Sequence, residues 1–284
     1  MNQPTSASDL PTVALADPRL HGYGIWDVHC HPVRGGDTPY RRMKYLVDVA
    51  DRMGVERMCI HMAFPFPALA TATPDQFRQD NAEIRAILKD WGSRAFGFAY
   101  LNPRYLKESL EELERCVADG PMVGIKLWIN WRCTRPELDP IIERCAQLKA
   151  VIFHHIWVKT GGNDGEESTP ADFVALSRRH PGVPMICGHT GGNWELGIRT
   201  IRSQREITAG VAGSEPVAGF LEMAVRELGP HRIVFGSDVE GRSLASQIAK
   251  VTGADITPEQ KRLVLKDNLR NLLLPILRQK GINA

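Results

Sequence analysis

Two histidines separated by one residue, His29 and His31, are the strongest sign of chemistry in this chain. They end the run DVHCH, which begins at Asp27 and follows an apolar stretch. Because side chains alternate along a strand, Asp27 and both histidines would share one face. Two imidazole nitrogens at this spacing can bind one divalent ion, and Asp27 could orient a ring or support the site from behind. Taken alone, the motif also fits two polar residues at the end of a strand.

Three other apolar runs end in histidine or aspartate. His154 and His155 close VIFHH, His189 closes MICGH, and Asp238 closes IVFGSD. One histidine in such a place more often belongs to the core or the surface than to a site. Four such ends are harder to assign to chance, because the C-terminal ends of all strands meet at one mouth in an α/β barrel. Histidine and aspartate together suit zinc or manganese.

The elements that would position these residues alternate along the chain. Short apolar runs separate longer amphipathic segments, which is the pattern of βαβ units with a parallel sheet. The expected strands are Gly24 to His31, Val55 to Met62, Ala95 to Leu101, Met122 to Ile129, Ala150 to Val158, Val183 to His189, Glu206 to Val211 and His231 to Asp238. The expected helices are Tyr40 to Met53, Pro74 to Trp91, Tyr105 to Asp119, Leu138 to Lys149, Pro170 to His180, Trp194 to Gln204, Pro216 to Leu228 and Leu244 to Val251. Eight strand–helix units predict a (β/α)8 TIM barrel, an α/β fold.

Two further features complete the expected fold. Thr257 to Asn268 and Leu269 to Leu277 predict extra C-terminal helices that pack over the barrel. Thr169 before Pro170 and Asp172 predicts a capped helix start. The polar connection Lys159 to Thr169 follows the fifth strand, which would place it at the face where active-site loops gather. No GxGxxG motif favours an open dinucleotide-binding sheet instead.

Composition narrows the classes of function. The 284 residues are 43% hydrophobic and 24% charged, with a net charge of +2, and predict one globular domain over residues 1–284. Interspersed charges argue against nucleic acid as a partner, and no apolar run is long enough to span a membrane. The opening segment, Met1 to Asp9, lacks the features of a signal peptide, so a cytoplasmic location is expected. The six cysteines lack CxxC spacing and are expected as free thiols; homo-oligomerisation stays open.

The motifs DVHCH, GIKLW, VIFHH, RHPGVPMICGHTGG, RIVFGSD and KDNLRNLL span nearly the whole chain. In this order they resemble the amidohydrolase superfamily, in particular the amidohydrolase-related branch that includes aminocarboxymuconate-semialdehyde decarboxylase. The resemblance implies that His29, His31, one fifth-strand histidine and Asp238 bind one divalent metal, with zinc the first choice and manganese the second. His154 is the better fifth-strand match, because it follows an apolar triplet directly; His155 is the alternative.

The resemblance also implies roles in catalysis. His189 would stand beside a metal-bound water, and Asp238 would take the proton of that water. Lys126 lies where some two-metal relatives carry a carboxylated lysine, although GIKL is typical of the one-metal branch too, so Lys126 is expected to contact substrate or the ligands. Hydrolysis of a lactone, ester or amide is the first expectation for the reaction. Nonoxidative decarboxylation of an aromatic or unsaturated carboxylate is the alternative, and a noncatalytic barrel that binds metal or ligand is a third.

A small-molecule substrate would contact residues at or just after the strand ends. Positive charge there suits a carboxylate, and indole rings suit a flat body. Each of these residues could equally be a surface charge or a packing indole. The candidates are Arg34, Lys126, Trp128, Trp157, Lys159, Asn193 and Trp194. His61, at the end of the second strand, is expected either to contact substrate or to be structural.

Overall fold

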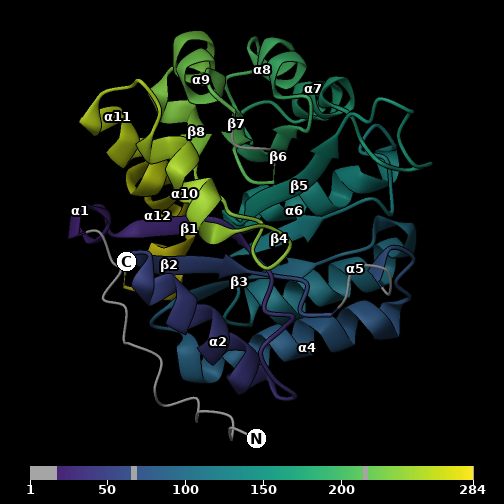
Figure 1. Ribbon diagram of the computed structural model, residues 1–284. Coiled ribbons are helices and arrows are strands. Elements are labelled where there is room, and N and C mark those ends of the chain that lie inside the picture. Colours follow the sequence, from purple (N-terminus) through teal and green to yellow (C-terminus); the bar gives the residue numbers. More distant parts are fainter. Residues whose placement is uncertain (1–17, 65–68, 214–216, 284) are drawn as a thin grey trace, which may run out of the picture.

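Eight parallel strands in sequential order form the barrel predicted from the sequence (Figure 1). The computed structural model describes residues 18–64, 69–213 and 217–283, so the segment Met1 to Asp9 and the expected helix start at Pro216 lie outside the described residues. The strands are β1 (Ile25–Cys30), β2 (Val55–Ile60), β3 (Ala95–Tyr100), β4 (Gly124–Leu127), β5 (Val151–Trp157), β6 (Met185–Gly191), β7 (Ile207–Gly210) and β8 (Ile233–Val234). Each expected strand is therefore present.

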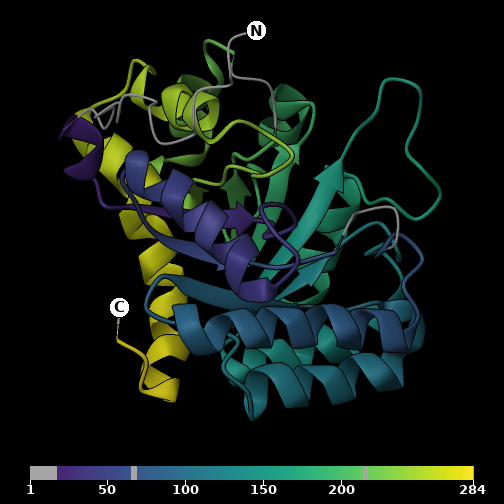
Figure 2. The same cartoon turned by 60° about the horizontal axis from the view of Figure 1, so that its bottom comes forward.

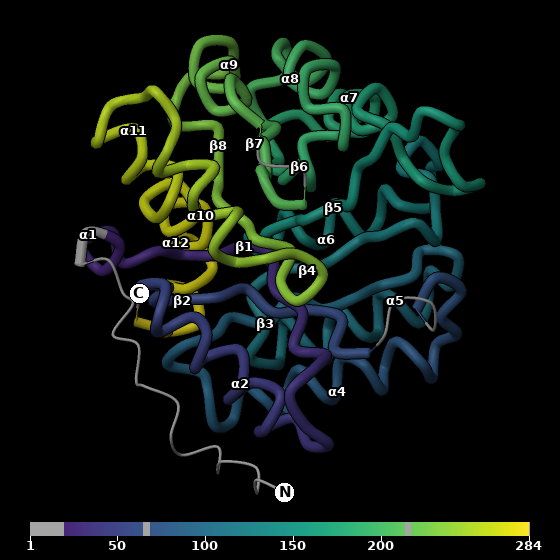
Figure 3. Tube along the Cα trace, viewed as in Figure 1, coloured from purple at the N-terminus to yellow at the C-terminus, as the bar shows by residue number. Residues whose placement is uncertain are grey.

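The helices lie outside the ring of strands, as the ribbon and the tube both show (Figures 1 and 3). They are α1 (Pro18–His21), α2 (Pro39–Arg52), α4 (Pro74–Trp91), α5 (Leu106–Leu113), α6 (Asp139–Leu148), α7 (Pro170–Arg179), α8 (Trp194–Ile201), α9 (Phe220–Leu228), α10 (Leu244–Thr252), α11 (Pro258–Arg262) and α12 (Asn268–Lys280). Thr169 caps α7 as expected, because its side chain accepts from the Asp172 amide while the Asp172 carboxylate accepts from the Thr169 amide.

The last strand is shorter than the sequence predicts, because the chain beyond it changes partner. Ile233 and Val234 pair with β7, whereas the following residues bond to β1. The Phe235 carbonyl accepts from the Val28 amide at 3.1 Å, and the Asp238 amide donates to the His29 carbonyl at 2.8 Å. These bonds join the first and last strands and hold the metal-site motifs of both side by side.

The core occupies both faces of the strands. Strands β1, β3, β4, β6 and β7 are buried along their whole length, as expected of parallel strands covered on both faces. All six cysteines are buried and unbridged, so the expected free thiols are confirmed. No helix among the described residues is long and apolar enough to cross a membrane.

The C-terminal helices contact the barrel beside β1 and β8. Two helices were expected here; instead, α11 and α12 are joined by a π-helical turn, Leu263–Asp267, in one helical run. Asn268 anchors this run, since its amide nitrogen donates to the carbonyls of Pro230 and Ile233, both at 2.7 Å. Figure 2 shows α12, in yellow, running along one side of the barrel.

Asp80 on α4 gives the fold a specific pH dependence. Its carboxylate accepts from the Phe64 amide at 3.0 Å, just after β2, and burial raises its pKa to about 7. An unfolded aspartate titrates near pH 4, so the native state favours the protonated form and its contribution to stability is lost as the pH rises through about 7. Between about pH 5 and about pH 8, we expect the free energy of unfolding to fall by about 2–3 kcal/mol more in the wild type than in Asp80→Asn.

Urea unfolding at the two pH values measures this difference. Asp75→Asn is the matched control, because it lies on the same helix with its side chain 98% exposed. Equal pH dependence in the wild type and Asp80→Asn would contradict the prediction.

Candidate metal centre and active site

A pocket of about 410 Å³ opens among the C-terminal ends of the strands. Eight of the residues predicted to bind metal or substrate or to act in catalysis line it: His29, His31, Lys126, Trp128, Trp157, Lys159, His189 and Asp238. His155 lines it as well. Sequence reasoning did not single out Met62, Ile129, Asp164, Glu167, Gly241 or Arg242, which complete the wall.

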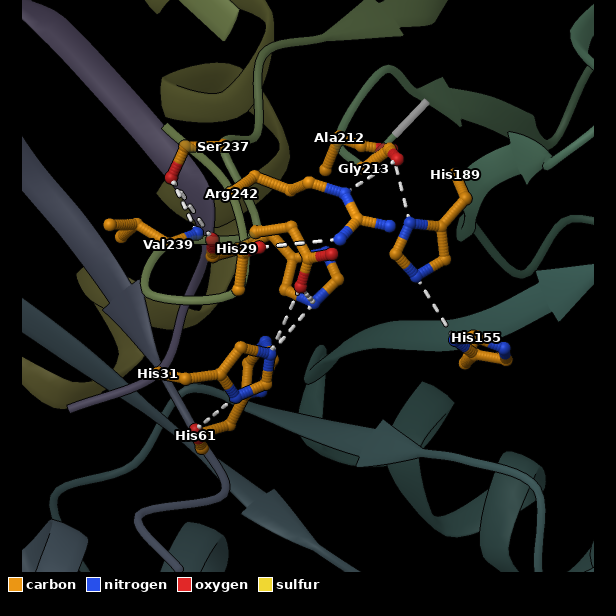
Figure 4. A network of polar contacts seen from close by, with 12 residues as sticks. His29, His31, His61, His155, His189, Ala212, Gly213, Ser237, Val239 and Arg242 are labelled. Atoms are coloured by element: carbon orange, nitrogen blue, oxygen red, sulfur yellow. Dashed lines mark hydrogen bonds and ion pairs between the residues drawn. The ribbon is translucent and has the colours of Figure 1, made fainter. Parts of the chain in front are cut away.

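Three predicted ligands converge in this pocket, and Figure 4 shows the rings of two of them, His29 and His31, side by side. The Nε2 atoms of His29 and His31 lie 3.0 Å apart, and Asp238 Oδ1 lies 3.3 Å from the first and 3.5 Å from the second. The His31 Nδ1–H donates to the carbonyl of His61 at 3.0 Å, so in a neutral His31 the lone pair belongs to Nε2. Two ring nitrogens and a carboxylate oxygen thus face one point, as metal ligands do.

Asp27 supports this group through the main chain. It was expected either to orient a ring or to support the site from behind, and the second role matches the structure, because its Oδ1 accepts from the amides of His29 at 2.9 Å and Ser237 at 3.0 Å. Burial raises the pKa of Asp27 to about 6 despite these bonds. Asp27 therefore joins β1 to the segment after β8, which constrains the distance between the predicted ligands on these two segments.

The histidine pair on β5 divides between the two faces of the strand. The structure does not bring His154 to the pocket: its ring is fully buried against Phe173 of α7, with ring centroids 5.8 Å apart. His155 lines the pocket, and its Nδ1 lies 3.0 Å from His189 Nε2. Alternation along the strand explains the division, since adjacent residues must point to opposite faces. His155 is therefore the fifth-strand histidine that this geometry offers as a ligand.

Glu167 holds His155 from the other side. Its carboxylate lies 2.9 Å from His155 Nε2 and is 3% exposed. Lys159 approaches the second carboxylate oxygen at 3.0 Å. Glu167 belongs to the connection Lys159 to Thr169, which was expected at the active face, although Glu167 itself was not singled out. The signal available in the sequence for Glu167 was an acidic residue in a loop expected at the active face.

Hydrogen bonding assigns the tautomers of the next pair. A carbonyl and a carboxylate can only accept, so His189 Nδ1–H donates to Ala212 at 3.0 Å and His155 Nε2–H donates to Glu167. Burial lowers the pKa of both rings, which favours their neutral forms. The remaining nitrogens, His155 Nδ1 and His189 Nε2, then direct lone pairs towards each other across 3.0 Å. Such an arrangement is stable only with a proton or a cation between or beside them.

Burial dominates the electrostatics of the centre. It lowers the pKa of His29 and His61 well below the usual range, so these imidazoles favour the neutral form that binds metals. It also lowers the pKa of Lys126 to about 7; the Lys126 ammonium nitrogen lies 3.4 Å from His29 Nε2. Burial alone would raise the pKa of Asp238, but its interactions with the His31 ring, His189 and Lys126 lower it to about 2. Asp238 is thus an ionised carboxylate.

Several predicted residues lie away from the pocket. Arg34 is exposed on the loop after β1 and does not line the cavity. Asn193 caps α8 by accepting from the Leu196 amide, and Trp194 stacks on Phe220 with centroids 5.1 Å apart. His61 is fully buried beneath His29 and His31, with which it forms a three-histidine group. The geometry therefore gives these residues structural environments rather than contact with the cavity.

Gly213 lies where a side chain would disrupt this centre. A Cβ there would come within 2.3 Å of His189 Nδ1 and 2.9 Å of Asp238 Oδ2, and its φ of +72° is unfavourable for other residues. We expect Gly213→Ala to lose about tenfold or more in activity and about 1–3 kcal/mol in stability. Thermal unfolding and steady-state kinetics measure both.

Gly219→Ala is the matched control, because Gly219 has φ +90° but open space around its Cβ position. It should share the backbone strain and keep the activity. Full activity in Gly213→Ala would show that His189 and Asp238 can move aside without consequence.

A comparison with known proteins identifies the family of this chain. A family model described as amidohydrolase matches residues 26–273. The chain belongs to this amidohydrolase family. The resemblance inferred from the motifs is therefore confirmed, and with it membership of an enzyme superfamily.

One curated protein is a distant relative of this chain. The 2-amino-3-carboxymuconate-6-semialdehyde decarboxylase of Dictyostelium discoideum is 25% identical over 140 residues, which are 43% of this chain and 39% of that protein, so the chain matches well under half of that relative's length.

Among solved structures, 2,6-dihydroxybenzoate decarboxylase from Rhizobium has a TM-score of 0.71 at 15% identity, over 89% of this chain and 99% of that one. Dihydroxybenzoic acid decarboxylase from Polaromonas sp. JS666, with bound manganese and the inhibitor 2-nitroresorcinol, has a TM-score of 0.70 at 17% identity, over 90% and 97%. At these identities the structural likeness shows the fold.

Proposed function

We propose that this member of the amidohydrolase family catalyses the metal-dependent nonoxidative decarboxylation of a small aromatic or unsaturated carboxylate. The observation that carries the proposal is the convergence of His29, His31, Asp238 and His155 on one pocket. Hydrolysis was the first expectation from the sequence, but it is not confirmed. The three relatives described above are named decarboxylases, which favours the alternative.

The donor set fits one divalent cation. His29 and His31 direct Nε2 atoms to one point beside the ionised Asp238 carboxylate, and His155 Nδ1 presents a lone pair to the same pocket. Facing lone pairs of neutral imidazoles are stabilised by a cation. We assign these four residues as ligands, with His155 in place of His154. Nitrogen and carboxylate donors suit zinc and manganese alike; manganese is bound in one relative.

The chemistry requires a proton at the carbon that carries the carboxylate. A divalent ion held by these residues would supply positive charge that binds and polarises the substrate's oxygen atoms. Asp238 can take a proton from a substrate hydroxyl or from water and deliver it to that carbon. The C–C bond to the carboxylate then breaks, its electron pair stays on the carbon, and carbon dioxide leaves. His189, held by Ala212, orients a substrate oxygen.

The walls of the pocket suit a flat anion. Trp157 stacks on His155 with an interplanar angle of 9°, and Trp128 stands perpendicular to the same ring. Both indoles line the cavity, where they can enclose an unsaturated ring or chain. Lys126 adds a positive charge when protonated. A volume of about 410 Å³ accommodates a molecule of the size of a substituted benzoate.

The test couples metal content to the product formed. Chelator-treated protein and protein refilled with Mn²⁺ or Zn²⁺ are incubated with hydroxybenzoates and unsaturated carboxylates, and separately with lactones and esters. We expect about one equivalent of metal by elemental analysis, carbon dioxide from a carboxylate only when metal is present, and loss of the metal in His29→Ala. Metal-dependent hydrolysis of a lactone or ester without release of carbon dioxide would overturn the proposal.

A further inference from the structure

Arg242 lies on the loop after β8, four residues beyond Asp238, and lines the same pocket as the proposed metal ligands. It is exposed at the mouth. In Figure 4 its guanidinium group lies between His29 and His189. The sequence gave no reason to single it out, because an arginine in a loop is ordinarily a surface charge.

Two neutral acceptors orient the guanidinium group. Arg242 Nε donates to the Gly213 carbonyl at 3.1 Å, and Nη1 donates to the Gly241 carbonyl at 3.2 Å. Neither acceptor carries a charge, and within residues 18–64, 69–213 and 217–283 Arg242 forms no ion pair. Its plane is therefore held by the main chain, and no carboxylate within those described residues pairs with its charge.

The other cations of the pocket are less available to an anion at the mouth, because one is already paired and the other is buried. Lys159 is bound by Asp164 and by Glu167 Oε2, the latter at 3.0 Å. Lys126 is fully buried beside His29, beneath the proposed metal site. Arg242 is thus the cation at the mouth best prepared to receive an anion, since its planar fork matches a carboxylate.

The main chain also places this charge next to the reacting groups. Gly213, which accepts from Arg242, packs so closely on His189 and Asp238 that a Cβ would come within 2.9 Å of each. One residue therefore separates the guanidinium group from both. An anion held by Arg242 would lie beside the site of proton transfer, in the same cavity as the metal ligands.

We propose that Arg242 binds a second acidic group of the substrate, so that the enzyme selects carboxylates that carry an additional carboxylate or phenolate over simple monocarboxylates. This inference rests on the proposed function, because the first carboxylate is the one placed at the metal site. A charge-assisted, two-point contact predicts a preference of about tenfold to a hundredfold.

Calorimetric titration of the Mn²⁺-loaded protein with isophthalate and benzoate tests the inference directly. Wild-type protein should bind isophthalate at least about tenfold more tightly than benzoate. Arg242→Met should remove this preference by weakening isophthalate alone, and Arg242→Lys should retain part of it. Arg34→Met is the matched control, because Arg34 is an exposed arginine outside the cavity; it should keep the full preference.

Equal or undetectable binding of the two acids by the wild type, or equal weakening of both by Arg242→Met, would overturn the inference. A purely structural brace would weaken both acids together, so the ratio separates the two roles. The binding assay needs no turnover, so a preserved preference without decarboxylation would sink only the proposed function. Decarboxylation of a dianion with unchanged KM in Arg242→Met would sink only the inference.

Discussion

Replacement of Asp238 by asparagine will lower the rate of decarboxylation by roughly a thousandfold while most of the metal stays bound. The carboxylate is ionised, with a pKa of about 2, and its Oδ1 lies within 3.5 Å of both His29 and His31. An amide keeps an oxygen for the metal but cannot take up and return a proton, so the proton-transfer contribution of about 10²–10⁴ is lost. Single-turnover release of carbon dioxide, with elemental analysis of the same sample, measures both quantities.

Asp164→Asn is the control for this change. Asp164 lines the same pocket but is paired with Lys159 and is 74% exposed, so its amide variant should keep most of the activity. Comparable activity in Asp238→Asn and the wild type would remove Asp238 from the proton transfer, whatever the metal content.

The second large effect separates the adjacent histidines of β5. His155→Ala should weaken metal binding by roughly a hundredfold or more and lose activity with it, because a nitrogen that faces the pocket disappears. His154→Ala should keep its metal and most of its activity, and lose about 1–3 kcal/mol of stability, because a buried ring that packs on Phe173 is removed. Metal titration, kinetics and thermal unfolding of the pair make the comparison.

The reverse pattern, with metal lost in His154→Ala and kept in His155→Ala, would restore the assignment favoured by the apolar triplet before His154. Loss of metal in both variants would indicate collapse of the strand rather than loss of a ligand. In that case His155→Gln, which preserves packing volume, distinguishes the two.

The fold was predictable because each strand is a short apolar run followed by an amphipathic helix, and the eight runs fall in sequence order around the ring. The positions of His29, His31, His189 and Asp238 followed from the fold, since strand ends share one mouth. The boundaries of β8 did not follow, because a change of hydrogen-bond partner from β7 to β1 leaves no trace in hydrophobicity.

The assignment on β5 shows what strand alternation could have added. Trp157 was predicted at the mouth, and a residue two positions earlier shares its face; that residue is His155, not His154. The prediction of both Trp157 and His154 was therefore inconsistent for a regular strand. The loop residues Glu167 and Arg242 escaped prediction for a different reason, since their positions depend on tertiary contacts with His155 and Gly213.

The contact between β1 and the segment after β8 bears on the order in which parts of this chain fold. Asp27 bonds to Ser237, 210 residues further along the chain, and the proposed ligands sit on either side of that junction. Closing so long a stretch of chain is entropically costly, so we expect this contact to form late during folding. Most of the hydrophobic core can therefore form before the proposed metal ligands are brought together. A bound ion would stabilise the contact between β1 and the segment after β8. Hydrogen exchange of the Asp238 and His31 amides would therefore report the local opening of this contact.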